Sequence, residues 1–178
     1  MPDKPSYLGL LNAIAQGEAR GHALFSAWAG ATPDAELQEL FTMVAIREWE
    51  HAAAFTKRLC ELGYTVKERP DPGFAARLTM LRSDCSDRDK FEQVFGYPRS
   101  DADPALGAIF DDTSIDPATG ALLGRFIAEE RDTLRRLQAA YEDLIENAAA
   151  PADLSDIVAR LERLTRCVDE LQARKRRR

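Results

Sequence analysis

A hydrophobic periodicity of 3.6 residues recurs in four long segments of this chain and restricts it to helical folds. Ala, Leu, Glu and Arg dominate the sequence, whereas Val, Ile, Thr and aromatic residues are sparse. This balance favours helices over strands. We therefore expect an all-α protein, with helices over residues 6–29, 33–62, 117–147 and 152–173.

Capping residues mark the ends of these segments. Thr32 and Pro33 suit the N-cap and the first position of the second helix, and Gly63 suits its end. Asp116 and Pro117 give the same start signal to the third helix. Short connections join the first helix to the second and the third to the fourth, so each pair is expected to form an antiparallel hairpin.

Residues 64–116 differ from the rest because proline and glycine interrupt them repeatedly. We expect a long crossover here, with short helical patches at residues 74–81 and 87–95. Two hairpins joined by a crossover form a four-helix bundle. At 178 residues the chain supports one good core, so residues 1–178 are expected to form a single domain.

The charge and the cysteine content of the chain limit the classes of function that we expect. The net charge is −6 even though residues 174–178, RKRRR, are all basic; we expect this run to be a disordered tail. An acidic body repels nucleic acid and anionic lipid, and no segment approaches 18 apolar residues, so neither specific nucleic-acid binding nor membrane insertion is expected. Cys60, Cys85 and Cys167 lack a CxxC spacing, which indicates inert packing thiols in a reducing, cytoplasmic compartment.

Four polar side chains interrupt the apolar faces. With 100° per residue, Glu48 and His51 lie within about 25° and 35° of the centre of the second helix's apolar stripe. Glu130 lies near the middle of the third helix's stripe, and Glu18 lies about 45° from the centre of the first. All four lie near the middle of their helices. We therefore expect these four groups, three carboxylates and one imidazole, to meet in one layer.

Neighbouring polar residues point elsewhere. Glu50 lies almost opposite the apolar stripe, and Glu129 lies about 100° from the centre of its own. His22 lies about 80° away, at the edge of the buried face. It is expected either to be an extra ligand or to hydrogen-bond Glu18 from the flank of the helix.

The outer face of the second helix carries Ile46 and Trp49, which are directed away from the inferred core. Such residues indicate a helix face that another element covers, here the crossover or a symmetric partner chain. A homodimer is therefore expected. Tyr141 is expected in the core, with its hydroxyl group bound to a polar partner.

Several ionised carboxylates cannot share a dry interior without compensation. A metal ion, a buried arginine such as Arg47 or Arg125, or shared protons would provide it. Carboxylates combined with a neutral imidazole suit iron, manganese or zinc. The i, i+3 spacing of Glu48 and His51 places both on one helical face, as a common ion requires.

This constellation resembles the ferritin-like superfamily, in particular its rubrerythrin-like members. In that family the first helix gives a Glu and the second gives Glu-x-x-His, and a second hairpin repeats the pattern. Glu18 matches the first Glu, while Glu48 and His51 match the Glu-x-x-His. Glu130 matches the Glu of the third helix. The resemblance implies these four residues as metal ligands, and it covers the helical frame but not residues 64–116.

The chain departs from the family in its fourth helix, because no histidine follows His51 and the corresponding positions are Arg160 and Arg163. We therefore expect one ion per chain, iron or else manganese or zinc, on Glu18, Glu48 and His51, with Glu130 as bridging ligand or base. The implied function is metal binding with oxygen, peroxide or iron redox chemistry on a small oxidant, as an iron-dependent oxidoreductase if the protein is an enzyme. The alternative is a metal-free, vestigial ferritin-like bundle that serves as a protein-interaction module.

Overall fold

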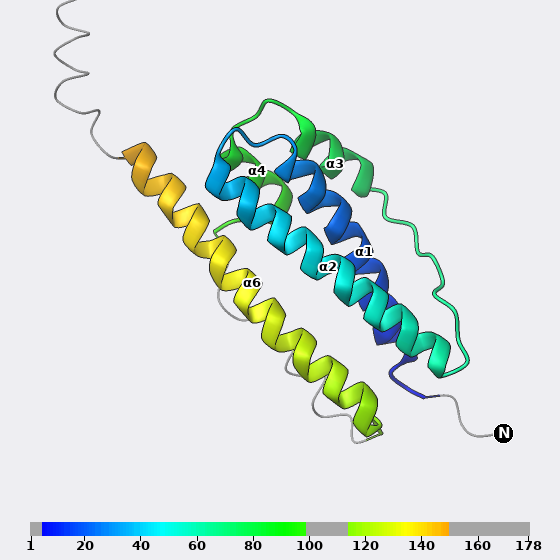
Figure 1. Ribbon diagram of the computed structural model, residues 1–178. Coiled ribbons are helices and arrows are strands. Elements are labelled where there is room, and N and C mark those ends of the chain that lie inside the picture. The colour runs from blue at the N-terminus through cyan, green and yellow to red at the C-terminus, as the bar shows by residue number, and fades with distance from the viewer. Residues whose placement is uncertain (1–4, 99–113, 150–178) are drawn as a thin grey trace, which may run out of the picture. The chain divides into compact units, whose positions relative to one another are not determined.

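The computed structural model describes residues 5–98 and 114–149, with the backbone alone for residues 147–149. These residues are all-helical, with five helices and no strand among them, which confirms the all-α prediction (Figure 1). None of these helices is both long enough and apolar enough to cross a bilayer. The helices are α1 (Leu8–Ala29), α2 (Ala35–Glu61), α3 (Phe74–Arg82), α4 (Asp87–Phe95) and α6 (Pro117–Ala149).

The chain divides into two compact units, residues 1–141 and residues 142–178. The first contains α1 to α4 and most of α6, and the candidate site lies entirely within it. Of the second unit, residues 142–149 are described, and they form the last turns of α6. The expected fourth helix and basic tail lie outside the described residues. The single-domain prediction therefore stays a prediction.

The crossover contains the two short helices that the sequence predicts. They are α3 and α4, at Phe74–Arg82 and Asp87–Phe95. Ser86 caps α4 by accepting the N–H of Asp89, and Gly96 ends it in the left-handed conformation, at φ 71°.

The start of α2 differs from the prediction. Asp34 caps it, accepting the N–H groups of Glu36 and Leu37 at 2.9 and 3.0 Å, so the expected cap at Thr32 is wrong. The hydroxyl group of Thr32 instead donates to Asp87 at 2.7 Å. The oxygen of Thr32 also accepts the N–H of Asp34 at 3.2 Å, so Thr32 lies in the turn before the helix rather than at its cap.

The predicted end of α2 at Gly63 and the predicted start of α6 at Asp116 are confirmed. Gly63 has φ 80° and its N–H donates to the carbonyl of Cys60, so that α2 ends in a left-handed glycine turn. Asp116 accepts the N–H groups of Ala118 and Thr119 at 3.0 and 3.1 Å and so caps α6.

The helix α2 pairs with α1 in the expected antiparallel hairpin and contacts α6 on another side (Figure 1). Contacts between α2 and α6 run in opposite directions along the two helices, which are therefore antiparallel. In order along α2, the contacting pairs are Arg47 with Thr133, His51 with Glu129, Phe55 with Phe126, and Arg58 with Thr119.

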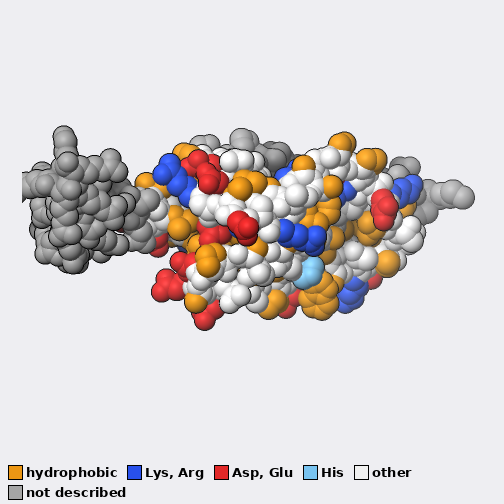
Figure 2. Space-filling view, turned by 90° about the horizontal axis from the view of Figure 1, so that it is seen from above, with side chains coloured by type: hydrophobic (Ala, Val, Ile, Leu, Met, Phe, Trp, Pro, Cys, Tyr) orange, Lys and Arg blue, Asp and Glu red, His pale blue; other side chains and the backbone are white. Residues whose placement is uncertain are grey.

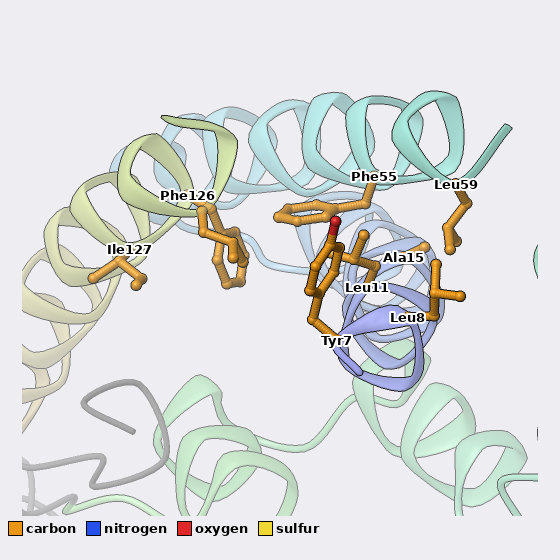
Figure 3. Packing of buried hydrophobic residues seen from close by; sticks show 9 residues of the cluster. Tyr7, Leu8, Leu11, Ala15, Phe55, Leu59, Phe126 and Ile127 are labelled. Atoms are coloured by element: carbon orange, nitrogen blue, oxygen red, sulfur yellow. The ribbon is translucent and has the colours of Figure 1, made fainter. Parts of the chain in front are cut away.

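Two hydrophobic groups flank the middle of these helices. One packs the first half of α1 against the second half of α2 and the first half of α6 (Figure 3). The other is an aromatic group at the opposite end of the α1–α2 hairpin. There Trp28 stacks on Phe41 and contacts Phe91 edge-on, with 3.9 and 4.7 Å between the ring centroids. Between them, the middles of the helices hold the polar layer. The first group comprises Tyr7, Leu8, Leu11, Ala15, Phe55, Leu59, Leu123, Phe126 and Ile127.

Predictions for individual side chains have mixed outcomes. Tyr141 is buried and its hydroxyl group donates to Glu92 at 3.0 Å, as expected. Cys60 and Cys85 are free and exposed, so the packing role predicted for them is wrong; Cys167 lies outside the described residues. Figure 2 shows a face on which hydrophobic, acidic and basic side chains are interspersed.

Candidate metal centre

Three of the four predicted ligands converge in the polar layer. One ligand atom each from Glu18 of α1, His51 of α2 and Glu130 of α6 lie within 4.8 Å of one another. The Nδ1 atom of His51 is 3.1 Å from Glu18 Oε2 and 3.5 Å from Glu130 Oε1. Glu18 and His51 are 8% and 4% exposed, whereas Glu130 is half-buried, so the group lies mostly inside the protein.

Glu48 is buried beside this group without belonging to the three-atom set. Its carboxylate lies directly against the backbone of α1. A Cβ atom built on Gly21 would lie 2.1 Å from Glu48 Oε2, closer than any real contact. The absence of a side chain at Gly21 therefore leaves the space that the Glu48 carboxylate occupies.

Replacing Gly21 by alanine should displace Glu48, whereas the same change at Gly17 should be harmless. A Cβ on Gly17 meets nothing within 4 Å, so Gly17→Ala is expected to stabilise the protein by about 1 kcal/mol through helix propensity. Gly21→Ala gains the same propensity but forces a buried carboxyl group to move, and should be less stable than Gly17→Ala by roughly 1–3 kcal/mol. Urea unfolding of both variants measures the difference; equal stabilisation would contradict the described position of Glu48.

The second ring nitrogen of His51 contacts Glu129, a residue that helical periodicity directs away from the layer. His51 Nε2 is 2.7 Å from Glu129 Oε2, and Arg125 Nε donates to the other oxygen of Glu129 at 2.9 Å. The prediction that Glu129 points away is therefore wrong. Its Cα lies beside the apolar stripe, and its two methylene groups carry the carboxylate around the helix to the imidazole.

Protons compensate part of the charge in this layer. Burial alone lowers the pKa of His51, but contacts with three carboxylates, led by Glu130, outweigh it and raise the pKa to about 10. Burial, with the nearby charges of Glu18 and Glu130, raises the pKa of Glu48 to about 9. Burial likewise raises the pKa of Glu18. Without an ion, the layer thus holds an imidazolium and a protonated Glu48 at neutral pH.

One oxygen in this layer lacks a hydrogen bond. Glu130 Oε1 is the single buried side-chain polar atom without a hydrogen-bond partner among the described residues. It lies 3.5 Å from His51 Nδ1, whose hydrogen the closer Glu18 oxygen accepts. Leaving a buried acceptor unsatisfied costs about 1–3 kcal/mol, so such an atom requires an explanation.

The other residues considered for this site bind elsewhere. His22 Nδ1 lies 2.8 Å from the carbonyl oxygen of Ala45, so neither role predicted for His22, ligand or partner of Glu18, is found. Arg47 donates to Asp132 and Thr133 of α6 rather than to the buried carboxylates. Among the described contacts, no arginine binds the three predicted carboxylate ligands.

A hollow of about 280 Å³ lies next to the imidazole of His51, between α2 and α6. Its walls are mostly apolar, with Arg125 and Glu50 as charged members. The hollow therefore adjoins one member of the layer, His51, on its α2–α6 side. The remaining lining residues are Trp49, Ala53, Ala54, Leu122 and Phe126.

Comparison of the chain with models of protein families, with curated proteins and with solved structures finds no match. The donor set itself can still be compared with the geometry of metal sites. Ligands about 2.1 Å from an ion are separated by about 3.0–3.4 Å when they occupy neighbouring positions. Two of the three separations, 3.1 and 3.5 Å around His51 Nδ1, are close to this range, and all three lie within 4.8 Å. These residues therefore fit a divalent ion of the iron, manganese and zinc class.

Proposed function

We propose that this chain is a ferritin-like metal-binding protein, rubrerythrin-like in type, with one divalent ion per chain, most readily iron. Glu18, His51 and Glu130 would hold the ion, with Glu48 next to them as an additional carboxylate. The predicted helix over residues 152–173 would complete the four-helix bundle. The observation that carries the proposal is Glu130 Oε1, a buried oxygen without a hydrogen bond that faces the other two ligand atoms.

The position of Glu129 supports the same proposal. A histidine that binds a metal usually donates its other ring N–H to a carboxylate, which fixes the tautomer and the orientation of the ring. Glu129 occupies this position at Nε2 of His51, and the lone pair of a neutral Nδ1 would then face Glu18 and Glu130. Arg125 in turn holds Glu129 in place.

A bound iron would supply Lewis-acid and one-electron redox chemistry towards a small oxidant such as oxygen or peroxide. The residues around it supply protons and shelter. Glu48, with its raised pKa, holds a proton beside Glu18 at neutral pH. Phe126 packs edge-on against the ring of His51, with 5.1 Å between the ring centroids, and covers one side of the imidazole.

A metal-free interaction module remains the second candidate, and one observation favours it. Both ring nitrogens of His51 already contact carboxylates, at 3.1 Å to Glu18 and 2.7 Å to Glu129. An imidazolium at this position compensates the buried charges much as an ion would. In this case the layer would be a self-contained ion cluster.

Metal analysis of the purified protein separates the two candidates. After loading with iron(II), manganese(II) or zinc(II) and removal of excess, we expect about one ion per chain and a melting temperature that rises on loading. Glu130→Gln should lose the ion, and Glu68→Gln, an exposed glutamate outside the layer, should keep it. A wild-type protein without metal after loading, whose melting is indifferent to chelator, would support the metal-free module.

A further inference from the structure

A second stripe runs along the solvent-facing side of α2. Its eight members are all exposed and are separated alternately by four and three residues. At its centre, Ile46 and Trp49 are 54% and 58% exposed, the two exposed large hydrophobic side chains among the described residues. The α2 stripe comprises Ala35, Glu39, Thr42, Ile46, Trp49, Ala53, Thr56 and Cys60.

Alternating spacings of four and three residues are the pattern by which two helices pack along a shared seam. Most other members of the α2 stripe are small, which allows another helix to approach closely. A shallow hollow of about 600 Å³ also lies beside Ile46, lined by Thr42 and Met43 of α2 and by Ala29 and Gly30 at the end of α1. The α2 stripe thus has both a projecting side chain, Trp49, and a hollow.

The α2 stripe is complementary to itself when reversed. Its positions are symmetric about the point between residues 47 and 48, so a second α2 running in the opposite direction meets it position by position. Ile46 would then lie opposite the partner's Trp49, next to the hollow. Moving outward from the centre, the small residue Thr42 would lie opposite the partner's Ala53, and Glu39 would lie opposite the partner's Thr56.

Charges on the flank of the α2 stripe agree with this pairing. The flanking positions are Glu36, Met43, Glu50 and Lys57, and all but the half-buried Met43 are exposed. In the reversed arrangement Lys57 lies opposite the partner's Glu36, and Glu50 lies opposite the partner's Met43. Opposite charges therefore meet twice across the pair, and like charges do not oppose each other at this flank.

We propose that α2 of this chain binds α2 of a second copy in antiparallel orientation along the α2 stripe. The observation that selects a second copy is this match of size and charge between the stripe and its own reverse. Trp49 and Ala53 also line the hollow next to His51, so the partner would cover that hollow. The pairing does not depend on whether a metal ion binds.

The native Cys60 provides a direct test in the full-length protein. Ala35 would lie opposite the partner's Cys60, which is exposed and free, so Ala35→Cys should give a disulfide-linked dimer under mild oxidation. The two positions are roughly 38 Å apart within one α2, which excludes a bond inside one chain. Ala35→Cys with Cys60→Ser, and Ala128→Cys at an exposed site on α6, are the controls and should not link efficiently. Equal linking in all three variants would overturn the proposal.

Sedimentation velocity of the unmodified chain gives the second test. The wild-type protein should be a dimer, and Trp49→Glu should raise the dissociation constant at least tenfold, because a carboxylate would be buried at the centre of the seam. The melting temperature of the monomer should not change, since Trp49 is exposed within one copy. A wild-type monomer would overturn the proposal, and protection of Trp49 from acrylamide quenching in that monomer would assign the α2 stripe to residues 152–173 of the same chain.

Discussion

The affinity of the site for a divalent ion should rise steeply with pH, by up to about 100-fold per pH unit around neutrality. The metal-free layer holds two protons, since the pKa of His51 is about 10 and that of Glu48 is about 9. The ion displaces the proton of His51 and, if Glu48 also becomes a ligand, the proton of Glu48. Below both values the protonated groups compete with the ion. Each displaced proton contributes a factor of about ten per pH unit.

The number of displaced protons can be read from the slope. If Glu48 binds the ion, Glu48→Gln should reduce the slope to about tenfold per pH unit, because the proton of His51 alone is then displaced. Competition titrations with a chelator of known pH dependence, between pH 6 and pH 8.5, measure both slopes. An affinity that does not change over this interval would mean that the ion binds away from His51.

Glu130→Gln should abolish tight binding, and Glu129→Gln should weaken it by about 10–100-fold. The first removes a charged ligand oxygen, whereas the second removes the carboxylate that orients the ring of His51. Glu68→Gln, which changes an exposed carboxylate outside the layer, is the control and should bind as the wild type does. Calorimetric titration with zinc(II) or manganese(II) ranks the three variants.

The stability of the metal-free variants distinguishes a ligand from a structural residue. Glu130 Oε1 has no hydrogen-bond partner and lies 3.5 Å from His51 Nδ1, so in the absence of metal Glu130→Gln should lower the melting temperature less than Glu129→Gln does. Glu129→Gln should lower it, because a charged hydrogen bond to the imidazolium of His51 is lost. A large loss of metal-free stability in Glu130→Gln alone would instead assign a structural role to Glu130.

The polar layer is predictable from the sequence for two reasons. Helical periodicity determines the direction in which a side chain points around its helix, and the helix ends determine its position along the helix. Both quantities place Glu18, Glu48 and His51 on the facing sides of one hairpin, and the structure buries all three. The direction of Glu130 followed from the same geometry once Asp116 had marked the start of its helix.

Helical periodicity does not predict contacts that depend on the length of a side chain or on a residue far away in the sequence. Glu129 lies at the wrong angle, yet its flexible side chain extends to the imidazole of His51. The spacing along α1 predicts a contact between His22 and Glu18, but His22 instead contacts a backbone carbonyl of α2. The close approach of Glu48 to Gly21 depends on the exact packing of α1 on α2, which a stripe of apolar residues does not specify.

Anomalous diffraction from crystals loaded with iron, manganese or zinc tests the central claim most directly. We expect one anomalous peak per chain, about 2.0–2.3 Å from Nδ1 of His51 and from carboxylate oxygens of Glu18 and Glu130. A layer without a peak, in which His51 still donates from Nδ1 to Glu18 after loading, would contradict it.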